Sequence, residues 1–457
     1  MISADIILFG LMGILLLGNM IFRILGNKKQ QFAFSAILLL ILIARIAIEM
    51  QTIPTHTIST LITINPFSLF FMLIFAVGMF LVNLLAYAYS GHYGDFALLS
   101  GFALSGMFLL SLSNSLITIF IGLELASLPA VFIILLSRRA TEAATKFFVM
   151  TSLAIALLSF AIVLFYGGTG GLMMLNQTTK TELLAFAAML FIVSLGIDSS
   201  IFPFNLLIPD VYEGSPAYVT AMLGGLNKKV AFAALIQILI LCFIGYRSAF
   251  EVIAILSVVT MFYGNIVAMM QKNLKRMLAY SSISQAGYIL IGLATSTQAG
   301  LAASLFQIFS HMFAFIGILG VVAWLEGRNK NRIDDLVGLN QENEFIALSM
   351  SLFMLAFVGL PLTTGFIGKF LLFTGAVGAG MTWLAVIGVI NSVISIYYYS
   401  KPIMTAYTVK NDARHVAIAR SVYAAIAIAL IITIVVGIYP QPVIGMANNA
   451  AAYLFHI

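Results

Sequence analysis

Long apolar segments separated by short polar loops run through the whole chain. A helix needs about 20 apolar residues to cross a bilayer, and these segments are continuous, whereas the strands of a β-barrel alternate. Fourteen segments can be placed, at residues 4–26, 32–50, 66–90, 95–113, 115–136, 145–167, 183–205, 216–244, 249–270, 276–296, 299–325, 345–376, 380–403 and 415–440. The pattern predicts an all-α integral membrane protein with about fourteen transmembrane helices.

Two of the predicted spans contain helix breakers. The seventh ends in IFPFNLLIPDVYEGSP, and the twelfth contains LPLTTGFIG, with Pro361 between Gly359 and Gly365. Proline removes a backbone donor and clashes with the preceding turn, so a break inside the membrane needs protein or water to satisfy the freed groups. We expect helices 7 and 12 to be broken, as in transporters built from inverted repeats. Ordinary proline kinks are the alternative.

The composition agrees with a membrane protein from end to end. Of 457 residues, 62% are hydrophobic and 8% are charged, against about 25% charged in a soluble domain. The mean hydropathy is +1.10, and the spans leave no room for a water-soluble domain of any size. The single cysteine, Cys242, excludes a disulfide framework, a CxxC zinc site and a cysteine-ligated iron–sulfur cluster on this chain.

The loop charges predict the orientation. Basic residues follow the odd-numbered spans: Lys28, Lys29, Arg138, Arg139, Lys272, Lys275, Arg276, Arg328, Lys330, Arg332, Lys401, Lys410 and Arg414. The loops after even-numbered spans carry mainly Lys180 and Arg247. Because positive loops stay in the cytoplasm, we expect a multi-pass protein of the cell membrane with both termini outside. The net charge of +6 therefore reflects orientation and does not indicate nucleic-acid binding.

Two acidic residues lie inside predicted spans, where an ionisable group costs roughly 2.5–3.5 kcal/mol. Glu124, in FIGLELASLP, is near the middle of the fifth span and is a candidate proton carrier. A structural carboxyl bonded to a neighbouring helix is the alternative. Asp198 precedes Ser199 and Ser200 on the interrupted seventh span, and those hydroxyls are its alternative partners. If Asp198 faces Glu124, the two carboxyls would share a proton.

Three lysines and one histidine also lie inside predicted spans. Lys228 and Lys229 point about 100° apart on a helix, so at most one faces a given polar axis and the other snorkels, pairs or lines a cavity. Lysine suits a proton relay, and Lys369 follows the glycine-rich break of the twelfth span. Snorkelling from a helix end is its alternative. His311, in QIFSHMFAFIG, is a further relay candidate or a satisfied core residue.

The other charges near the spans have simpler interpretations. Arg45 and Glu49 are four residues apart on the second span, which predicts a local ion pair. Asp210 and Glu213 face the cytoplasm in the predicted topology, where a helix-cap or loop role is the alternative to a functional one. No nucleotide-binding loop, nucleophile triad or metal-ligand cluster occurs in the sequence.

Several polar segments occur in order along the chain. They are GLELASLP, EAATKFFV at 142–149, PFNLLIPDVYEGSP, LKRMLAYSSISQAGY at 274–288, IDDLVGL at 333–339 and GLPLTTGFIGKF. Through them, from about residue 95 to 375, the chain resembles the antiporter-like membrane subunits of respiratory complex I, which are related to Mrp-type cation antiporters. The form PDVYEGSP favours the subunit N branch of that family.

The resemblance implies a proton-translocating module with two inverted five-helix repeats. Residues 1–94 would form helices 1–3, residues 95–245 the first repeat, residues 246–403 the second repeat, and residues 404–457 helix 14. Glu124 matches the family's glutamate on helix 5 and Lys369 its charged residue on helix 12. Lys228 matches the lysine on helix 8 in subunit N spacing, and Lys229 in Mrp-type spacing.

One segment departs from the family pattern. Where the family has GFKLSxVPFH, this chain has GIDSSIFPFN, so Asp198 replaces a lysine and Asn205 a histidine. A glutamate–lysine ion pair would then become two carboxyls that share a proton. The path is then rewired, uses Lys229 as a substitute cation, or is less active in this subunit.

The resemblance implies a membrane-arm subunit of a complex I-type NADH:quinone oxidoreductase, acting through Glu124, Asp198, Lys228, Lys229, Lys369 and His311. No cofactor is expected on this chain, and flavin and iron–sulfur clusters would lie on other subunits. The expected partners are the other membrane-arm subunits, the lipid bilayer and transported protons, with no nucleic acid. The alternatives are the equivalent subunit of an archaeal reduced-deazaflavin dehydrogenase, an Mrp-type Na⁺/H⁺ antiporter subunit, and a structural subunit without an active path.

Overall fold

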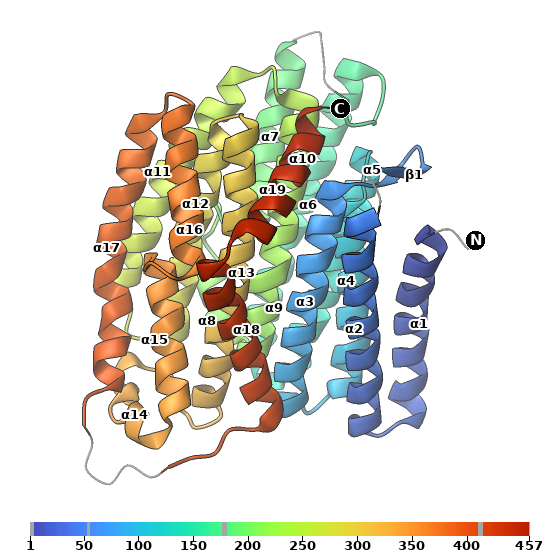
Figure 1. The fold of residues 1–457 in the computed structure, drawn as a ribbon. Helices are drawn as coiled ribbons and strands as arrows, with labels where there is room; N and C mark the ends of the chain where they lie inside the picture. Colours follow the sequence, from blue (N-terminus) through green and yellow to red (C-terminus); the bar gives the residue numbers. More distant parts are fainter. Residues whose placement is uncertain (1–3, 53–54, 176–180, 410–414, 457) are drawn as a thin grey trace.

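A computed structural model describes residues 4–52, 55–175, 181–409 and 415–456 of the chain. Figure 1 shows a bundle of long helices that run roughly side by side. In this view α1 begins at its upper end, α19 ends near the top of the bundle, and α14 lies at the lower end. The start of α1 and the end of α19 therefore point toward the same side of the bundle. Three basic residues of the orientation argument, Lys180, Lys410 and Arg414, lie outside the described residues.

Up to residue 214, the described residues form nine helical segments and a short hairpin. The helices are α1 (Ala4–Leu25), α2 (Lys28–Thr52), α3 (Pro66–Tyr89), α4 (Tyr93–Ser111), α5 (Leu116–Leu135), a 3-10 turn (Arg138–Ala140), α6 (Thr141–Thr169), α7 (Glu182–Asp198) and α8 (Ile208–Gly214). Strands β1 (His56–Ser59) and β2 (Ile62–Ile64) pair antiparallel in the α2–α3 connection, with Thr57 opposite Thr63. The sequence pattern did not predict this hairpin.

The second half is also helical. Its segments are α9 (Ala217–Met222), a π-helical turn (Leu223–Asn227), α10 (Lys228–Phe243), α11 (Arg247–Met269), α12 (Leu274–Ala294), α13 (Gln298–Glu326), a 3-10 turn (Ile333–Leu336), α14 (Leu339–Glu342), α15 (Glu344–Val358), α16 (Thr364–Gly378), α17 (Thr382–Ala406), α18 (Arg420–Ile438) and α19 (Gln441–Phe455). Helix α19 packs on α3 and α13, and the sequence analysis missed it because its apolar stretch is short and contains polar residues.

The helices match the predicted membrane protein class. Within the described residues, twelve helices are long and apolar enough to cross a membrane, counting α9, the π turn and α10 as one continuous segment. The remaining predicted spans, the seventh and the twelfth, are the two that the helix breakers interrupt.

The first interruption separates α7 from α8. Helix α7 ends at Asp198 and the chain resumes regular helix at Ile208. Ser200 has a positive φ of 60°, which turns the chain out of the helix immediately after Asp198. The predicted span at 183–205 is therefore too long at its end, because the turn begins before the first proline.

The second interruption separates α15 from α16 through close backbone contact. Gly359 ends α15 with a φ of 97°, a conformation that glycine adopts without strain. A Cβ on Gly365 would lie 1.7 Å from the carbonyl oxygen of Ala356, so only glycine allows the start of α16 to pack there. The predicted break in the twelfth span is confirmed as two separate helices.

The centre of the bundle is formed by α12, α13 and the α9–α10 segment. The span windows of α12 and α13 are 100% buried and that of α9–α10 is 94% buried, whereas that of α1 is 22% buried. Apolar exposure on the outer helices suits contact with lipid or with other membrane proteins. The central helices carry three of the six predicted site residues, Lys228, Lys229 and His311.

Candidate functional site

The six predicted site residues occupy five of the bundle's helices. Glu124 lies on α5, Asp198 ends α7, Lys228 and Lys229 begin α10, His311 lies on α13, and Lys369 lies on α16. Lys228 is 2% exposed, Lys229 0%, His311 1% and Lys369 4%, while Glu124 and Asp198 are half-buried. Such groups need polar partners because an isolated charge is costly away from water.

A small cavity joins Asp198 to Lys228. Its volume is about 30 Å³, and its lining includes Asp198, Lys228, Asn227, Ser127 and Thr151. Within the described residues no ion pair closes the gap between the carboxylate and the ammonium. A cavity of this size accommodates a water molecule when polar groups line it. Proton transfer between Asp198 and Lys228 would therefore use a bridging water.

Asn227 supports a water in this cavity. Its Nδ2 donates to the carbonyl oxygen of Ala126 at 2.9 Å, whereas its Oδ1 is buried and has no partner in the protein. A buried acceptor without a protein partner usually bonds to water. The π-helical turn that ends at Asn227 presents this side chain toward α5, directly before the two lysines.

Glu124 and Asp198 interact electrostatically, but within the described residues no hydrogen bond joins their carboxyls. Direct proton sharing between the two acids is therefore not seen. The neighbouring hydroxyls do not satisfy Asp198 either, because Ser199 Oγ donates to the Leu195 carbonyl at 2.6 Å and Ser200 Oγ has no protein partner. Asp198 thus lies at a break and is one of the residues that line the cavity.

Both adjacent lysines point into the protein, each toward a different helix. Lys228 Nζ donates to the carbonyl oxygen of Ser282 at 2.7 Å and to its hydroxyl at 3.1 Å, both on α12. Lys229 Nζ and His311 Nδ1, on α13, are hydrogen-bonded at 2.8 Å. The angular separation of the two lysines therefore directs them to two neighbouring helices, and neither snorkels to the surface.

Lys369 binds the end of α15. Its Nζ donates to the carbonyl oxygens of Phe357 at 2.8 Å and Val358 at 2.9 Å, and it lies 4.5 Å from the ring centre of Tyr288. The last carbonyls of a helix have no intrahelical partner and carry partial negative charge, which favours an ammonium. The snorkelling alternative for Lys369 is wrong, because the break supplies its partners inside the bundle.

Two glutamines that were not among the predicted site residues extend the polar contacts of Lys369. Gln285 Nε2 donates to the Phe357 carbonyl at 3.2 Å, the same oxygen that accepts from Lys369. Gln307 Nε2 donates to Gln285 Oε1 at 2.9 Å and lies one turn before His311. Gln285 is three residues after Ser282, so both share one face of α12. Polar residues at this spacing inside predicted spans were the signal that would have found them.

The first interruption contains further buried polar atoms. Asn205 is 0% exposed, and both its Nδ2 and its Oδ1 lack protein partners, as does Ser200 Oγ. Three such atoms within six residues indicate ordered water along the broken segment. The chain between α7 and α8 is therefore polar on its inner side.

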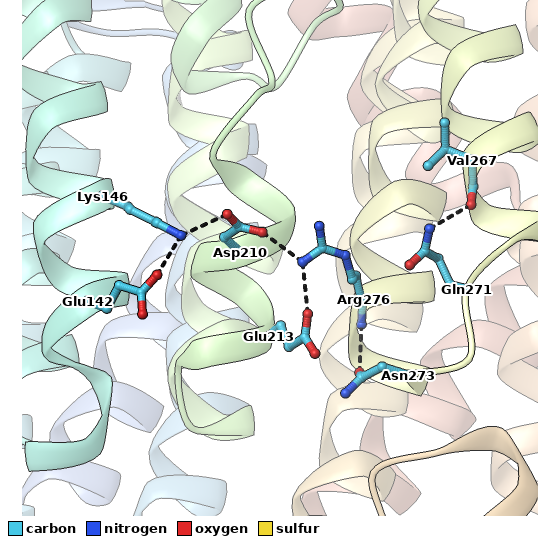
Figure 2. A network of polar contacts seen from close by, with 8 residues as sticks. All are labelled: Glu142, Lys146, Asp210, Glu213, Val267, Gln271, Asn273 and Arg276. Carbon is cyan, nitrogen blue, oxygen red and sulfur yellow. Dashed lines mark hydrogen bonds and ion pairs between the residues drawn. The ribbon is translucent and has the colours of Figure 1, made fainter.

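A further group of charged residues, separate from the six predicted site residues, lies at the α8 end of the first interruption (Figure 2). Asp210, on α8, accepts from Lys146 of α6 at 2.8 Å and from Arg276 of α12 at 2.7 Å. Arg276 also donates to Glu213 at 2.9 Å, and Lys146 also pairs with Glu142 at 2.7 Å. Asp210 and Glu213 are thus members of an ionic network between three helices.

The hydrogen bond from Lys146, followed by the one from Arg276, holds the pKa of Asp210 below its usual range, although burial opposes them. A lowered carboxyl pKa stabilises the fold above the carboxyl's ordinary pKa of about 3.9, and this contribution is lost as the pH falls through the lower folded value. We therefore expect Asp210→Asn to lower the melting temperature by about 1–2 °C at pH 7, and by less below about pH 4.

Thermal unfolding of the detergent-solubilised complex at several pH values measures this difference. Glu142→Gln is the matched control, because it removes an acid that pairs with the same Lys146 from within α6. A gap between wild type and Asp210→Asn that widens as the pH falls would contradict the assignment.

A bundle of membrane-length helices with buried ionisable side chains in its centre defines a polytopic membrane protein with an internal charged row. Residues 113–395 match the model of the family described as NADH:quinone oxidoreductase/Mrp antiporter, TM. This chain belongs to that family.

Individual relatives give the same assignment. The chain is 34% identical over 429 residues to F(420)H(2) dehydrogenase subunit N of Methanosarcina mazei, covering 87% of this chain and 85% of that protein. It is 32% identical over 459 residues to NADH-quinone oxidoreductase subunit N of Heliobacterium modesticaldum, covering 96% and 97%. A chain of respiratory complex I from Thermus thermophilus superposes with a TM-score of 0.85 at 26% identity, covering 97% and 100%.

These findings confirm the predicted resemblance to subunit N and the class of multi-pass membrane protein. Among the described residues, no group of three or more His, Cys, Asp or Glu side chains is placed to hold a metal ion.

Proposed function

We propose that this chain is the proton-translocating, subunit N-like membrane subunit of a complex I-type NADH:quinone oxidoreductase. The observation that carries the proposal is the row of ionisable side chains that crosses the bundle from α5 to α16. Its members are Glu124, Asp198, Lys228, Lys229, His311 and Lys369. A buried ionisable group in a membrane protein is retained where it carries protons or ions, because it is otherwise costly.

Several contacts support an order along the row. A water in the cavity between Asp198 and Lys228 would carry a proton between them. Lys229 and His311 share a hydrogen bond. Gln307, one turn before His311 on α13, donates to Gln285, and Gln285 donates to the carbonyl that binds Lys369. Because charges interact strongly in this medium, protonation at one site changes the proton affinity of the next. A charge change at a neighbouring subunit would thereby move protons along the row.

We further propose fourteen transmembrane spans arranged as two inverted five-helix repeats at residues 95–245 and 246–403, with residues 1–94 and 404–457 outside them. The two interrupted segments support this arrangement, since each brings a buried ionisable residue to its break. Asp198 ends α7 and Lys369 lies on α16, shortly after the α15–α16 break. Broken helices at corresponding positions of two halves mark the transport site in inverted-repeat transporters. The basic loops support both termini outside the cell membrane.

The outer face of α5 supports a partner subunit beside Glu124. The exposed positions Ile117, Ile121, Leu128 and Phe132 recur at helical spacing, and Glu124 falls on the same stripe. A carboxyl on a stripe that faced only lipid would be unfavourable. A neighbouring membrane-arm subunit that covers this stripe would supply polar partners for the Glu124 carboxyl. A charge change in that subunit would then act on Glu124 directly. Flavin, iron–sulfur clusters and quinone chemistry would belong to other subunits of the complex.

One observation favours a second candidate, the equivalent subunit of a dehydrogenase that oxidises reduced deazaflavin. The relative from Methanosarcina mazei, at 34% identity, is a subunit of such an enzyme by its name. The proton path would be the same, and only the electron donor would differ. An Mrp-type Na⁺/H⁺ antiporter subunit is the third candidate, and its complex would exchange Na⁺ for H⁺ without oxidising a donor.

Purification of the chain with its native partners, followed by reconstitution into vesicles, tests the function. We expect quinone-dependent oxidation of NADH or of reduced deazaflavin to build a proton gradient that a protonophore abolishes and that needs no Na⁺. Partners that lack a donor-oxidising module, together with Na⁺-dependent dissipation of a pH gradient, would instead identify an antiporter. The donor that drives the gradient decides between the first two candidates.

A further inference from the structure

Helix α8 is too short to hold its own position. It comprises seven residues, Ile208–Gly214, between the interruption after α7 and the turn at Ser215 and Pro216. An isolated helix shorter than about 12 residues is marginal, because nucleation costs more than a few backbone bonds return. Contacts with other helices must therefore fix α8 in place.

The start of α12 binds α8 and the turn that follows it. Arg276 donates to Asp210 at 2.7 Å and to Glu213 at 2.9 Å, three residues apart on α8. The preceding residue, Lys275, donates to the carbonyl oxygen of Ser215 at 2.6 Å, directly after α8. Lys275 also pairs with Glu326, whose other oxygen accepts from a backbone N–H at the start of α9. Two consecutive basic residues thus fix both the face and the end of α8.

Helix α6 holds the same element from the other side. Lys146 donates to Asp210 at 2.8 Å, so the Asp210 carboxylate bridges cations from α6 and α12. Figure 2 shows Asp210 between these two side chains. Acids and bases are nearly balanced in the hollow of about 250 Å³ that this network lines, so it offers no site for an anionic ligand. The charged side chains instead join α6, α8 and α12.

The opposite side of α8 contacts the proposed proton-transfer site. Ile208 and Tyr212 line the cavity that contains Asp198 and Lys228. The Tyr212 hydroxyl lies 2.8 Å from where a Cβ on Gly224 would be, in the π-helical turn that leads to Lys228. The Tyr212 side chain also lies near that of Ser282, the residue that accepts from Lys228. A shift of α8 would therefore move the wall of the cavity.

We propose that Lys146, Asp210, Glu213 and Arg276 are positioning residues for proton transfer, which hold α8 so that Tyr212 and Ile208 shape the cavity between Asp198 and Lys228. This inference rests on the proposed function. The network brings together parts of three polar segments noted in the sequence, EAATKFFV, PDVYEGSP and LKRMLAYSS. It gives a role to the charged residues of these segments, which are not members of the buried row.

The first test replaces the bridging acid. Asp210→Asn in the assembled complex should lower proton translocation several-fold at unchanged assembly, because α8 loses both cationic contacts at that position. Glu142→Gln is the matched control: Glu142 also pairs with Lys146, but it lies on α6 and its side chain is 81% exposed. It should leave translocation unchanged. If Asp210→Asn fails to assemble, Glu213→Gln, which removes one of the two acids of Arg276, takes its place.

A reversible cross-link then separates positioning from other roles. A Cβ on Gly214 would lie 3.0 Å from the Cβ of Ala143 on α6, and a disulfide needs a Cβ separation of about 3.8 Å. Small shifts would therefore allow Ala143→Cys with Gly214→Cys to tie the end of α8 to α6. The native Cys242 is buried and does not compete. In the Asp210→Asn background, the oxidised pair should restore translocation, and reduction should abolish the rescue.

Each outcome decides the inference. Full translocation in Asp210→Asn, or no rescue by the oxidised pair, would overturn it. Loss of translocation on cross-linking the otherwise wild-type chain would also overturn it, because α8 would then have to move during turnover. The variant Lys228→Met distinguishes failure of the positioning role from failure of the proposed function. If Lys228→Met abolishes translocation and Asp210→Asn does not, only the positioning role fails, whereas wild-type translocation in Lys228→Met refutes the proposed function itself.

Discussion

Replacing Lys228 by methionine lowers proton translocation through this chain by about tenfold or more, because removal of a group that transfers a proton typically costs 10²–10⁴-fold in rate. Methionine matches the length of lysine and buries no charge, so the fold is retained at this position, where Lys228 is 2% exposed. The Ser282 carbonyl and hydroxyl lose their donor, and the cavity loses its cation. Protons released per electron pair in reconstituted vesicles measure the effect.

A second lysine supplies the control for this variant. Lys272 is exposed at the loop before α12 and has no place in the buried row. Lys272→Met should leave both assembly and translocation at wild-type values. Equal losses in both variants would show that the effect comes from altered charge or assembly and not from the position of Lys228.

The second large loss of proton translocation is expected for Asp198→Asn. Asparagine preserves the shape of the side chain but cannot release a proton, so we expect translocation to fall by about tenfold or more. Asp198→Glu keeps the carboxyl and should retain measurable translocation. The same vesicle measurement, at matched levels of assembled complex, compares the two variants. Wild-type translocation in Asp198→Asn would mean that this chain replaces the family's lysine with a side chain of no functional consequence.

Much of the fold follows from the sequence because the membrane imposes it. Apolar segments of about 20 residues must be helical, since the backbone has no other hydrogen-bond partners in lipid. The breaks near Pro203 and Pro361 were also predictable from their residue types. The ion pair between Arg45 and Glu49, predicted from their spacing on one helix face, is present in the structure.

The partners of the buried charges could not be predicted, because they depend on which helices meet. Lys369 finds its acceptors in the carbonyls of α15, and backbone carbonyls carry no signal in the sequence. The separation of Lys228 and Lys229 on their helix was predicted, but their partners on α12 and α13 depend on which helices pack around α10. The π-helical turn before the two lysines was not predicted from the sequence LGGLN either. The ionic network at Asp210 likewise joins residues 146, 210 and 276, which only the tertiary fold brings together.

The central claim is that protons cross this chain through the cavity between Asp198 and Lys228. Measuring protons translocated per electron pair in Lys228→Met, Asp198→Asn and the double variant tests it most directly. Because both residues line one cavity, their effects should not add. The account predicts that each single variant and the double variant lose translocation to a similar extent, while all three assemble and Lys272→Met matches wild type. Wild-type translocation in both single variants would contradict it.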